Sequence, residues 1–165
     1  MRKKRDFHWS ILIAIPILAI LVMVIAGELF LTSRYKKSKL YQSDSEIGWV
    51  PKKNFTYSEV KSDIAGNKYN VKVSTNKYGF RTWGNVTSDK LKILFIGDSF
   101  TGDPNMSDED AYYGQIKKFL DVEVFAFGGG GYGTLQELMI LKKYASIINP
   151  DYFVLQFCSN DFLNN

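Results

Sequence analysis

The chain has 165 residues, enough for one ordinary domain but not for two. Its 21 Lys and Arg side chains outnumber its 17 Asp and Glu side chains, yet the excess lies at the N-terminus. Residues 1–40 hold eight basic and two acidic side chains, which leaves 13 basic and 15 acidic in the remainder. A nucleic-acid-binding domain needs basic residues clustered on its folded part, so we expect no nucleic-acid partner. Cys158 is the only cysteine, which excludes a disulfide within the chain.

An unbroken apolar run of 17 residues, from Ile11 to Gly27, follows the first basic cluster and resumes after Glu28. A helix needs about 20 apolar residues to cross a bilayer. Proline is tolerated in spanning helices, so Pro16 does not exclude one. A core helix would be expected to show a polar face over this length. The sequence therefore predicts a single-pass helix over Ile11–Leu31 with the membrane lipid bilayer as its partner.

The orientation of this segment follows from its flanks. A secretory signal has a shorter apolar region and a better cleavage site than Ala26-Gly27, so we expect an uncleaved anchor. Basic residues stand on both sides, at positions 2–5 and 34–39, and the earlier cluster is tighter. We therefore expect a cytoplasmic tail and a soluble part outside the cell membrane.

Four segments are predicted along the chain. Residues 1–31 form the basic tail and anchor, and residues 32–45 form a polar juxtamembrane linker. Residues 46–90 form a β-rich lead-in, because short stretches with alternating apolar residues, such as Tyr69, Val71 and Val73, are separated by turn residues. Residues 91–165 have a different pattern and form the main domain.

In the main domain, buried-type strands over Leu91–Ile96, Val122–Phe127 and Tyr152–Phe157 alternate with two helices. This alternation predicts an α/β fold, with a parallel sheet in the order 2-1-3 and helices on both of its faces. The first helix is expected over Ser107–Leu120, with Ser107 and Asp110 at capping-box spacing. The second is expected over Thr134–Ile148, where leucines supply an apolar pattern.

Ligands of such sheets bind at the carboxyl ends of the strands, which directs attention to three loops. The first, Gly97–Asn105, presents Ser99 directly after a strand. Thr101 departs from the nucleophile-elbow pattern Gly-x-Ser-x-Gly. By itself, Gly-Asp-Ser favours a plain turn over a nucleophile.

The second loop, Gly128–Gly133, satisfies Gly-x-Gly-x-x-Gly between a strand and a helix, which makes dinucleotide binding a competing hypothesis. That fingerprint belongs to the first strand of its unit, and the acidic residue expected about twenty positions later is poorly placed. Asp151 precedes its strand, and Asp161 lies 28 residues after Gly133. Such glycines can also expose a backbone N–H to a ligand oxyanion. In the third loop, Cys158–Asn165, Asn160 either caps the backbone or points its amide at a developing charge.

Together the three loops resemble the first three sequence blocks of the SGNH hydrolase (GDSL esterase/lipase) family. The resemblance covers residues 91–165 and rests on the order and spacing of Gly97-Asp98-Ser99, Gly131-Tyr132-Gly133-Thr134 and Asn160-Asp161. Two positions depart from the family pattern, Ala126 where members often have Asn and Cys158 where they usually have Gly.

The resemblance implies an incomplete three-layer, flavodoxin-like parallel sheet and a serine esterase that needs neither cofactor nor metal. The predicted helix over Ile11–Leu31 would make this esterase membrane-anchored. Ser99 would be the nucleophile, and the Ser99 N–H, the Gly131 N–H and the Asn160 amide would form the oxyanion hole. Asp98 and Asp161 would be orienting residues. The partner would be an ester-bearing small molecule or glycan.

A serine hydroxyl needs an oriented base, which the family supplies in an Asp-x-x-His block. The only histidine of this chain, His8, precedes the membrane segment. We therefore expect the 165 residues to be an incomplete and nearly inactive member. Two alternatives stay open, a noncatalytic binding or assembly protein and an O-acyltransferase on the same scaffold.

Overall fold

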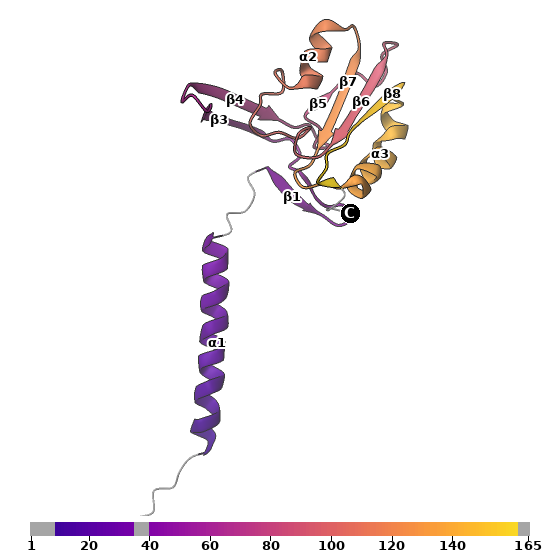
Figure 1. Ribbon diagram of the computed structural model, residues 1–165. Helices are drawn as coiled ribbons and strands as arrows, with labels where there is room; N and C mark the ends of the chain where they lie inside the picture. The colour runs from indigo at the N-terminus through magenta and orange to yellow at the C-terminus, as the bar shows by residue number, and fades with distance from the viewer. Residues whose placement is uncertain (1–8, 35–39, 162–165) are drawn as a thin grey trace, which may run out of the picture. The chain divides into compact units, whose positions relative to one another are not determined.

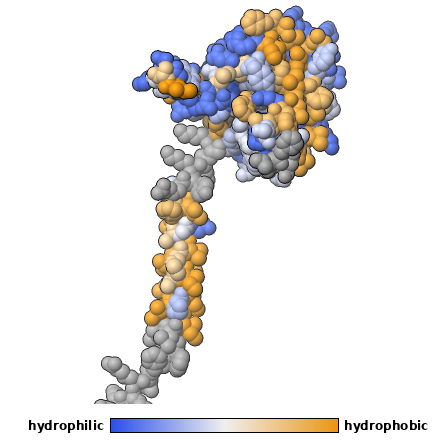
Figure 2. All heavy atoms as spheres, viewed as in Figure 1, coloured by the Kyte–Doolittle hydropathy of each residue, from blue (hydrophilic) through white to orange (hydrophobic). Residues whose placement is uncertain are grey.

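The computed structural model describes residues 9–34 and 40–161 (Figure 1). The chain divides into two compact units, residues 1–39 and residues 40–165. The first contains the helix α1, Trp9–Arg34. Its stretch Ile13–Ser33 is long and apolar enough to cross a membrane, and its large apolar side chains are 52–66% exposed (Figure 2). The helix continues through Pro16, as is common in spanning segments.

Two antiparallel hairpins begin the second unit. Strand β1 (Tyr41–Asp44) pairs with β2 (Gly48–Pro51), and β3 (Thr56–Ser62) pairs with β4 (Lys68–Ser74). Strand β1 lies inside the range that the sequence predicts as a linker, so the linker is shorter than expected. The reason is local, because the Asp44 carboxylate accepts hydrogen bonds from the backbone N–H groups of Glu46 and Ile47 and turns the chain.

The main sheet has four strands in the order β5-β7-β6-β8. Strands β6 (Lys92–Gly97), β7 (Glu123–Gly128) and β8 (Tyr152–Gln156) are parallel, and the short β5 (Thr82–Trp83) pairs antiparallel with β7. The predicted order 2-1-3 of the three parallel strands is confirmed. Through β5, the predicted β-rich lead-in is part of the same sheet.

Helix α3 (Thr134–Ile148) has the predicted bounds, whereas α2 (Tyr112–Phe119) begins five residues later than predicted. The prediction of a capping box at Ser107 is wrong, because α2 begins at Tyr112. The Ser107 hydroxyl instead accepts the Lys72 N–H at 3.1 Å, which holds this segment against β4 in place of a first helical turn.

The two helices cover opposite faces of the sheet (Figure 1). Helix α3 packs against every second residue of β6 and β7. Helix α2 packs against the intervening residues, whose side chains point to the other face. The first cluster includes Ile140, Tyr144, Ile148, Leu94, Ile96, Phe125 and Phe127, and the second includes Tyr113, Phe95, Val124 and Ala126. This alternation of faces is what a two-residue side-chain period dictates.

Strand β8 differs from its buried neighbours. Tyr152, Phe153, Val154 and Leu155 are 40–62% exposed, although all four are apolar in character. Within the described residues β8 pairs with β6 alone, so it forms an edge of the sheet.

Candidate functional site

Ser99 lies immediately beyond the carboxyl end of β6, at a sharp turn. Asp98 is fully buried, whereas Ser99 and Phe100 are exposed. The turn is held by two hydrogen bonds of Asp98: its carboxylate accepts the Phe100 N–H at 2.9 Å, and its carbonyl accepts the Gly102 N–H at 3.0 Å. Ser99 is thereby exposed at the edge of the sheet, while Asp98 is held in the interior.

Thr101 has a structural role that the sequence pattern did not reveal. It is fully buried, its Oγ1 donates to Oε1 of Gln156 at 2.5 Å, and it lies 3.0 Å from the Tyr112 hydroxyl. A Cβ at Gly97 would lie 2.4 Å from Thr101 Oγ1. Thr101 therefore ties the serine loop to β8 and α2, which accounts for a side chain at this position instead of the glycine of an elbow.

The third loop joins the first through Asn160. Its Nδ2 donates to Oδ2 of Asp98 at 3.1 Å. The Asn160 backbone is fixed by a turn in which Asp161 Oδ2 accepts the Cys158 N–H at 2.7 Å and the Asp161 N–H donates to the Cys158 carbonyl at 3.0 Å. Asp98 thus holds the side chain of Asn160, and Asp161 holds the backbone turn that carries Asn160.

The glycine-rich loop (Gly128–Gly133) packs directly against the backbone of the serine loop (Gly97–Asn105). A Cβ at Gly128 would lie 2.2 Å from the Gly102 nitrogen, so neither position has room for a side chain. The Gly129 N–H also donates to the Gly97 carbonyl at 3.2 Å. Gly131 is exposed and has φ +75°, a conformation that favours glycine.

Most N–H groups of this loop already have protein partners. Those of Gly129, Gly130, Tyr132 and Gly133 donate to the Gly97 carbonyl, the Tyr41 hydroxyl, the Gly129 carbonyl and Oε1 of Gln136. In residues 129–133, only the Gly131 N–H has no hydrogen-bond partner among the described residues. A pyrophosphate cradle uses several free N–H groups, so this geometry disfavours the dinucleotide hypothesis and leaves one donor.

Three carboxyl groups are buried beside these loops, and one of them, Glu137, was not predicted as part of the site. Glu137, Asp98 and Asp161 are all 0% exposed. Among the described residues, neither oxygen of Glu137 nor Oδ1 of Asp161 has a hydrogen-bond partner. Burial, followed by the charges of Asp161 and Asp98, raises the pKa of Glu137 to about 7. Its place on the Glu137–Ile140–Tyr144–Ile148 stripe of α3 was the available signal.

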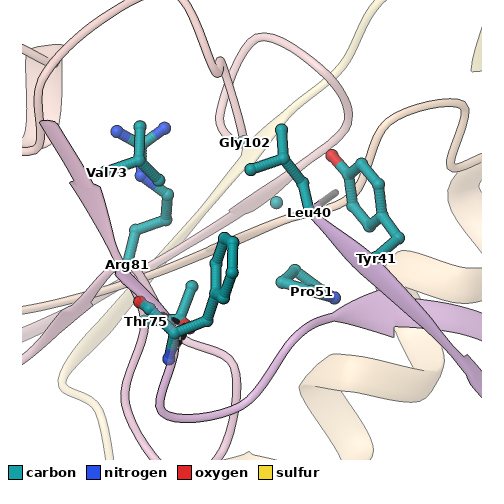
Figure 3. Close-up of a pocket in the computed structure, with 9 residues that line it drawn as sticks. Leu40, Tyr41, Pro51, Val73, Thr75, Arg81 and Gly102 are labelled. Carbon is teal, nitrogen blue, oxygen red and sulfur yellow. Dashed lines mark hydrogen bonds between the residues drawn. The ribbon is translucent and has the colours of Figure 1, made fainter. Parts of the chain in front are cut away.

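A pocket of about 20 Å³ lies next to the contact between the serine loop and the glycine-rich loop (Figure 3). Gly102 and Gly128 line it, with Leu40 and Tyr41 on one side and Arg81 on the other. A volume of this size holds about one water molecule. It is therefore too small to accept a substrate.

The structure brings Asp98 and Asn160 into contact, and the loop that carries Gly131 lies beside the serine loop. No hydrogen bond connects Gly131 to Ser99 or Asn160. His8 lies outside the described residues, and residues 9–34 and 40–161 contain no histidine. Within the same ranges, no group of three His, Cys, Asp or Glu side chains could hold a metal ion.

The sequence matches no protein-family model, and a comparison with curated proteins also finds no match. The function therefore has to be argued from the site.

Proposed function

We propose that the chain carries the first part of a serine esterase site of the SGNH type, on a flavodoxin-like fold. Ser99 is the nucleophile, and its N–H, the Gly131 N–H and the Asn160 amide bind the oxyanion. The observation that carries this proposal is the hydrogen bond from Asn160 to Asp98. It uses one amide hydrogen of Asn160 and leaves the other for a substrate, next to the residue that precedes Ser99.

In the proposed reaction the Ser99 hydroxyl attacks the ester carbonyl carbon as its proton passes to a base. The developing oxyanion needs donors at about 2.7–3.1 Å. The tetrahedral intermediate then expels the alcohol, and water hydrolyses the acyl-enzyme. The described residues supply no histidine base, so in this proposal the base comes from outside residues 9–34 and 40–161.

We further propose that α1 anchors the protein in the cell membrane, with the esterase outside. The N-terminal basic cluster supports this orientation, and it favours an ester of an envelope glycan or lipid as the substrate. Protease added to intact cells should then degrade the region after Thr32. Protection of a folded protein would mean the opposite orientation.

The test of the nucleophile uses a fluorophosphonate probe, which labels activated serines. Without a base, the 165-residue chain should label about 10⁴-fold or more slowly than an intact triad. The same chain extended at its C-terminus by a segment that carries an Asp-x-x-His block should label readily. Ser99→Ala should abolish that labelling, and Ser159→Ala, at an exposed serine of the third loop, should leave it unchanged.

Two outcomes would redirect the proposal. Rapid labelling of the 165-residue chain would mean that another group activates Ser99. An extended, folded chain that does not label would favour the noncatalytic binding protein. If labelling succeeds, product analysis with a sugar acceptor separates hydrolysis from O-acyl transfer.

A further inference from the structure

The β1–β2 hairpin holds Gly130 of the glycine-rich loop on both sides. The indole Nε1 of Trp49 donates to the Gly130 carbonyl at 2.9 Å. The Gly130 N–H donates to the Tyr41 hydroxyl, also at 2.9 Å. Burial raises the pKa of Tyr41, so this acceptor remains a neutral hydroxyl. Both side chains reach the loop from a hairpin that was not predicted to be part of the site.

These contacts fix more than Gly130. The Gly130 carbonyl and the Gly131 N–H belong to one peptide group, which is planar and trans, so they point in opposite directions. A hydrogen bond that holds the carbonyl toward Trp49 therefore directs the Gly131 N–H away from the indole nitrogen. This is the N–H of residues 129–133 that has no partner among the described residues.

The hairpin is itself held by the loop. The Tyr132 hydroxyl donates to the Trp49 carbonyl at 2.6 Å, and the two rings lie 6.0 Å apart. Tyr132 is fully buried, and its ring covers Gly129 so closely that a Cβ there would lie 2.3 Å from it. Lys143 of α3 also pairs with Glu46, in the turn between β1 and β2, at 2.8 Å. Loop and hairpin thus form one hydrogen-bonded unit.

We propose that Trp49 and Tyr41 are positioning residues, which orient the Gly131 N–H as an oxyanion donor. The inference rests on the proposed esterase function. Without the Trp49 donor, the peptide between Gly130 and Gly131 can rotate about its flanking bonds. Glycine on both sides makes that rotation easy, so the donor would lose its alignment while the sheet remains folded.

The first test measures the Gly131 N–H directly, by ¹⁵N relaxation of the full chain in detergent micelles. The order parameter should be that of rigid backbone, about 0.85, and should fall below about 0.6 in Trp49→Phe. Tyr41→Phe, which keeps the ring and removes the acceptor, should lower it as well. The matched controls are Trp83→Phe, in β5, and Tyr69→Phe, at an exposed position of β4. Both should leave Gly131 rigid.

The second test measures catalysis, in the extended chain that labels at Ser99. Trp49→Phe should lower the maximal labelling rate by about 10-fold to 100-fold, short of the 10²–10³ lost when an oxyanion donor is removed. The probe concentration for half-maximal rate should change little, because the donor acts on the transition state.

The two tests distinguish failure of the positioning role from failure of the esterase proposal. A Gly131 N–H that stays rigid in both Trp49→Phe and Tyr41→Phe overturns the positioning role, whatever Ser99 does. If Gly131 becomes mobile and the labelling rate is unchanged, Gly131 is not an oxyanion donor and the positioning role fails as well. If Ser99 never labels, the esterase proposal fails and takes the catalytic role of the two residues with it.

Discussion

The Asn160 amide and the Asp98 carboxylate are hydrogen-bonded across 62 positions of the chain, at 3.1 Å. This bond connects the loop after β8 to the turn after β6. It is also the contact through which a change in the third loop would reach Ser99.

Asn160→Asp should break this connection, because two carboxylates would then face each other at a part-buried position. We expect a loss of about 1–3 kcal/mol in the free energy of unfolding. Urea unfolding of the chain in a mild detergent measures it. The double variant Asp98→Asn with Asn160→Asp restores a donor opposite an acceptor and should recover most of the loss. A single variant as stable as the wild type would contradict the assignment.

Glu137→Gln should change how stability depends on pH. Burial and the neighbouring aspartates raise the pKa of Glu137 from 4.5 to about 7 in the folded state. The folded state therefore binds more protons than the unfolded state between these values, and the wild type loses stability as the pH rises through them. The difference corresponds to roughly 3 kcal/mol, which the uncharged Gln does not lose.

Unfolding curves from pH 4 to pH 8 test this. The two proteins should be similarly stable at pH 4, and the variant should be the more stable at pH 8. Glu109→Gln, at an exposed glutamate, should follow the wild type. Parallel curves for wild type and Glu137→Gln would show that Glu137 keeps an ordinary pKa.

Gly128→Ala should separate the serine and glycine-rich loops. The new Cβ would lie 2.2 Å from the Gly102 nitrogen, and backbone atoms cannot rotate away as a side chain can. We expect at least about 2 kcal/mol of destabilisation. Gly66→Ala is the control, since its Cβ would meet no atom within 4 Å and its positive φ costs about 1 kcal/mol. Equal losses for the two variants would mean that the loops separate freely.

Arg81→Lys should loosen the segment between Ser99 and α2. The guanidinium donates to the Asp108 carboxylate at 2.6 Å, to the Met106 carbonyl at 2.7 Å, and to the Asp103 carbonyl. An ammonium cannot satisfy this spread of acceptors, so a loss of about 2–4 kcal/mol in unfolding free energy is expected. Lys90→Ala, which removes the exposed pair with Asp121, should cost under about 1 kcal/mol.

The three parallel strands of the sheet could be predicted because their signal is local and strong. The strands over residues 91–96, 122–127 and 152–157 are short apolar runs, and right-handed crossovers leave few possible orders for them. Helix α3 was predicted by its apolar pattern, which ends at Ile148 before the helix-stopping pair Asn149-Pro150. Its leucines were a poor guide to its buried face, since Leu135 and Leu138 are 60% and 44% exposed.

The errors occur where distant residues decide the local structure. Ser107 is a good helix cap in isolation, but its hydroxyl accepts a hydrogen bond from the Lys72 N–H of β4 instead. The hydrogen-bond partners of Thr101, Gln156 and Tyr112, are distant in sequence, so no local pattern could reveal its role. For the candidate site, the positions of Ser99, Gly131 and Asn160 on the three loops followed from topology. The contributions of Trp49 and Glu137 depend on packing that no local pattern records.

The distance along the chain between the hairpin and the loop it holds has a consequence for folding. Gly130 is 89 positions from Tyr41 and 81 from Trp49, so closing these contacts carries a large chain-entropy cost that local pairing does not. On the ribosome the hairpin is made first and must wait for its loop. We therefore expect the loop to reach its final geometry late, after β6 and β7 have paired. Transient release of the hairpin would then free the glycine-rich loop with the sheet still intact, as a local opening far less costly than global unfolding.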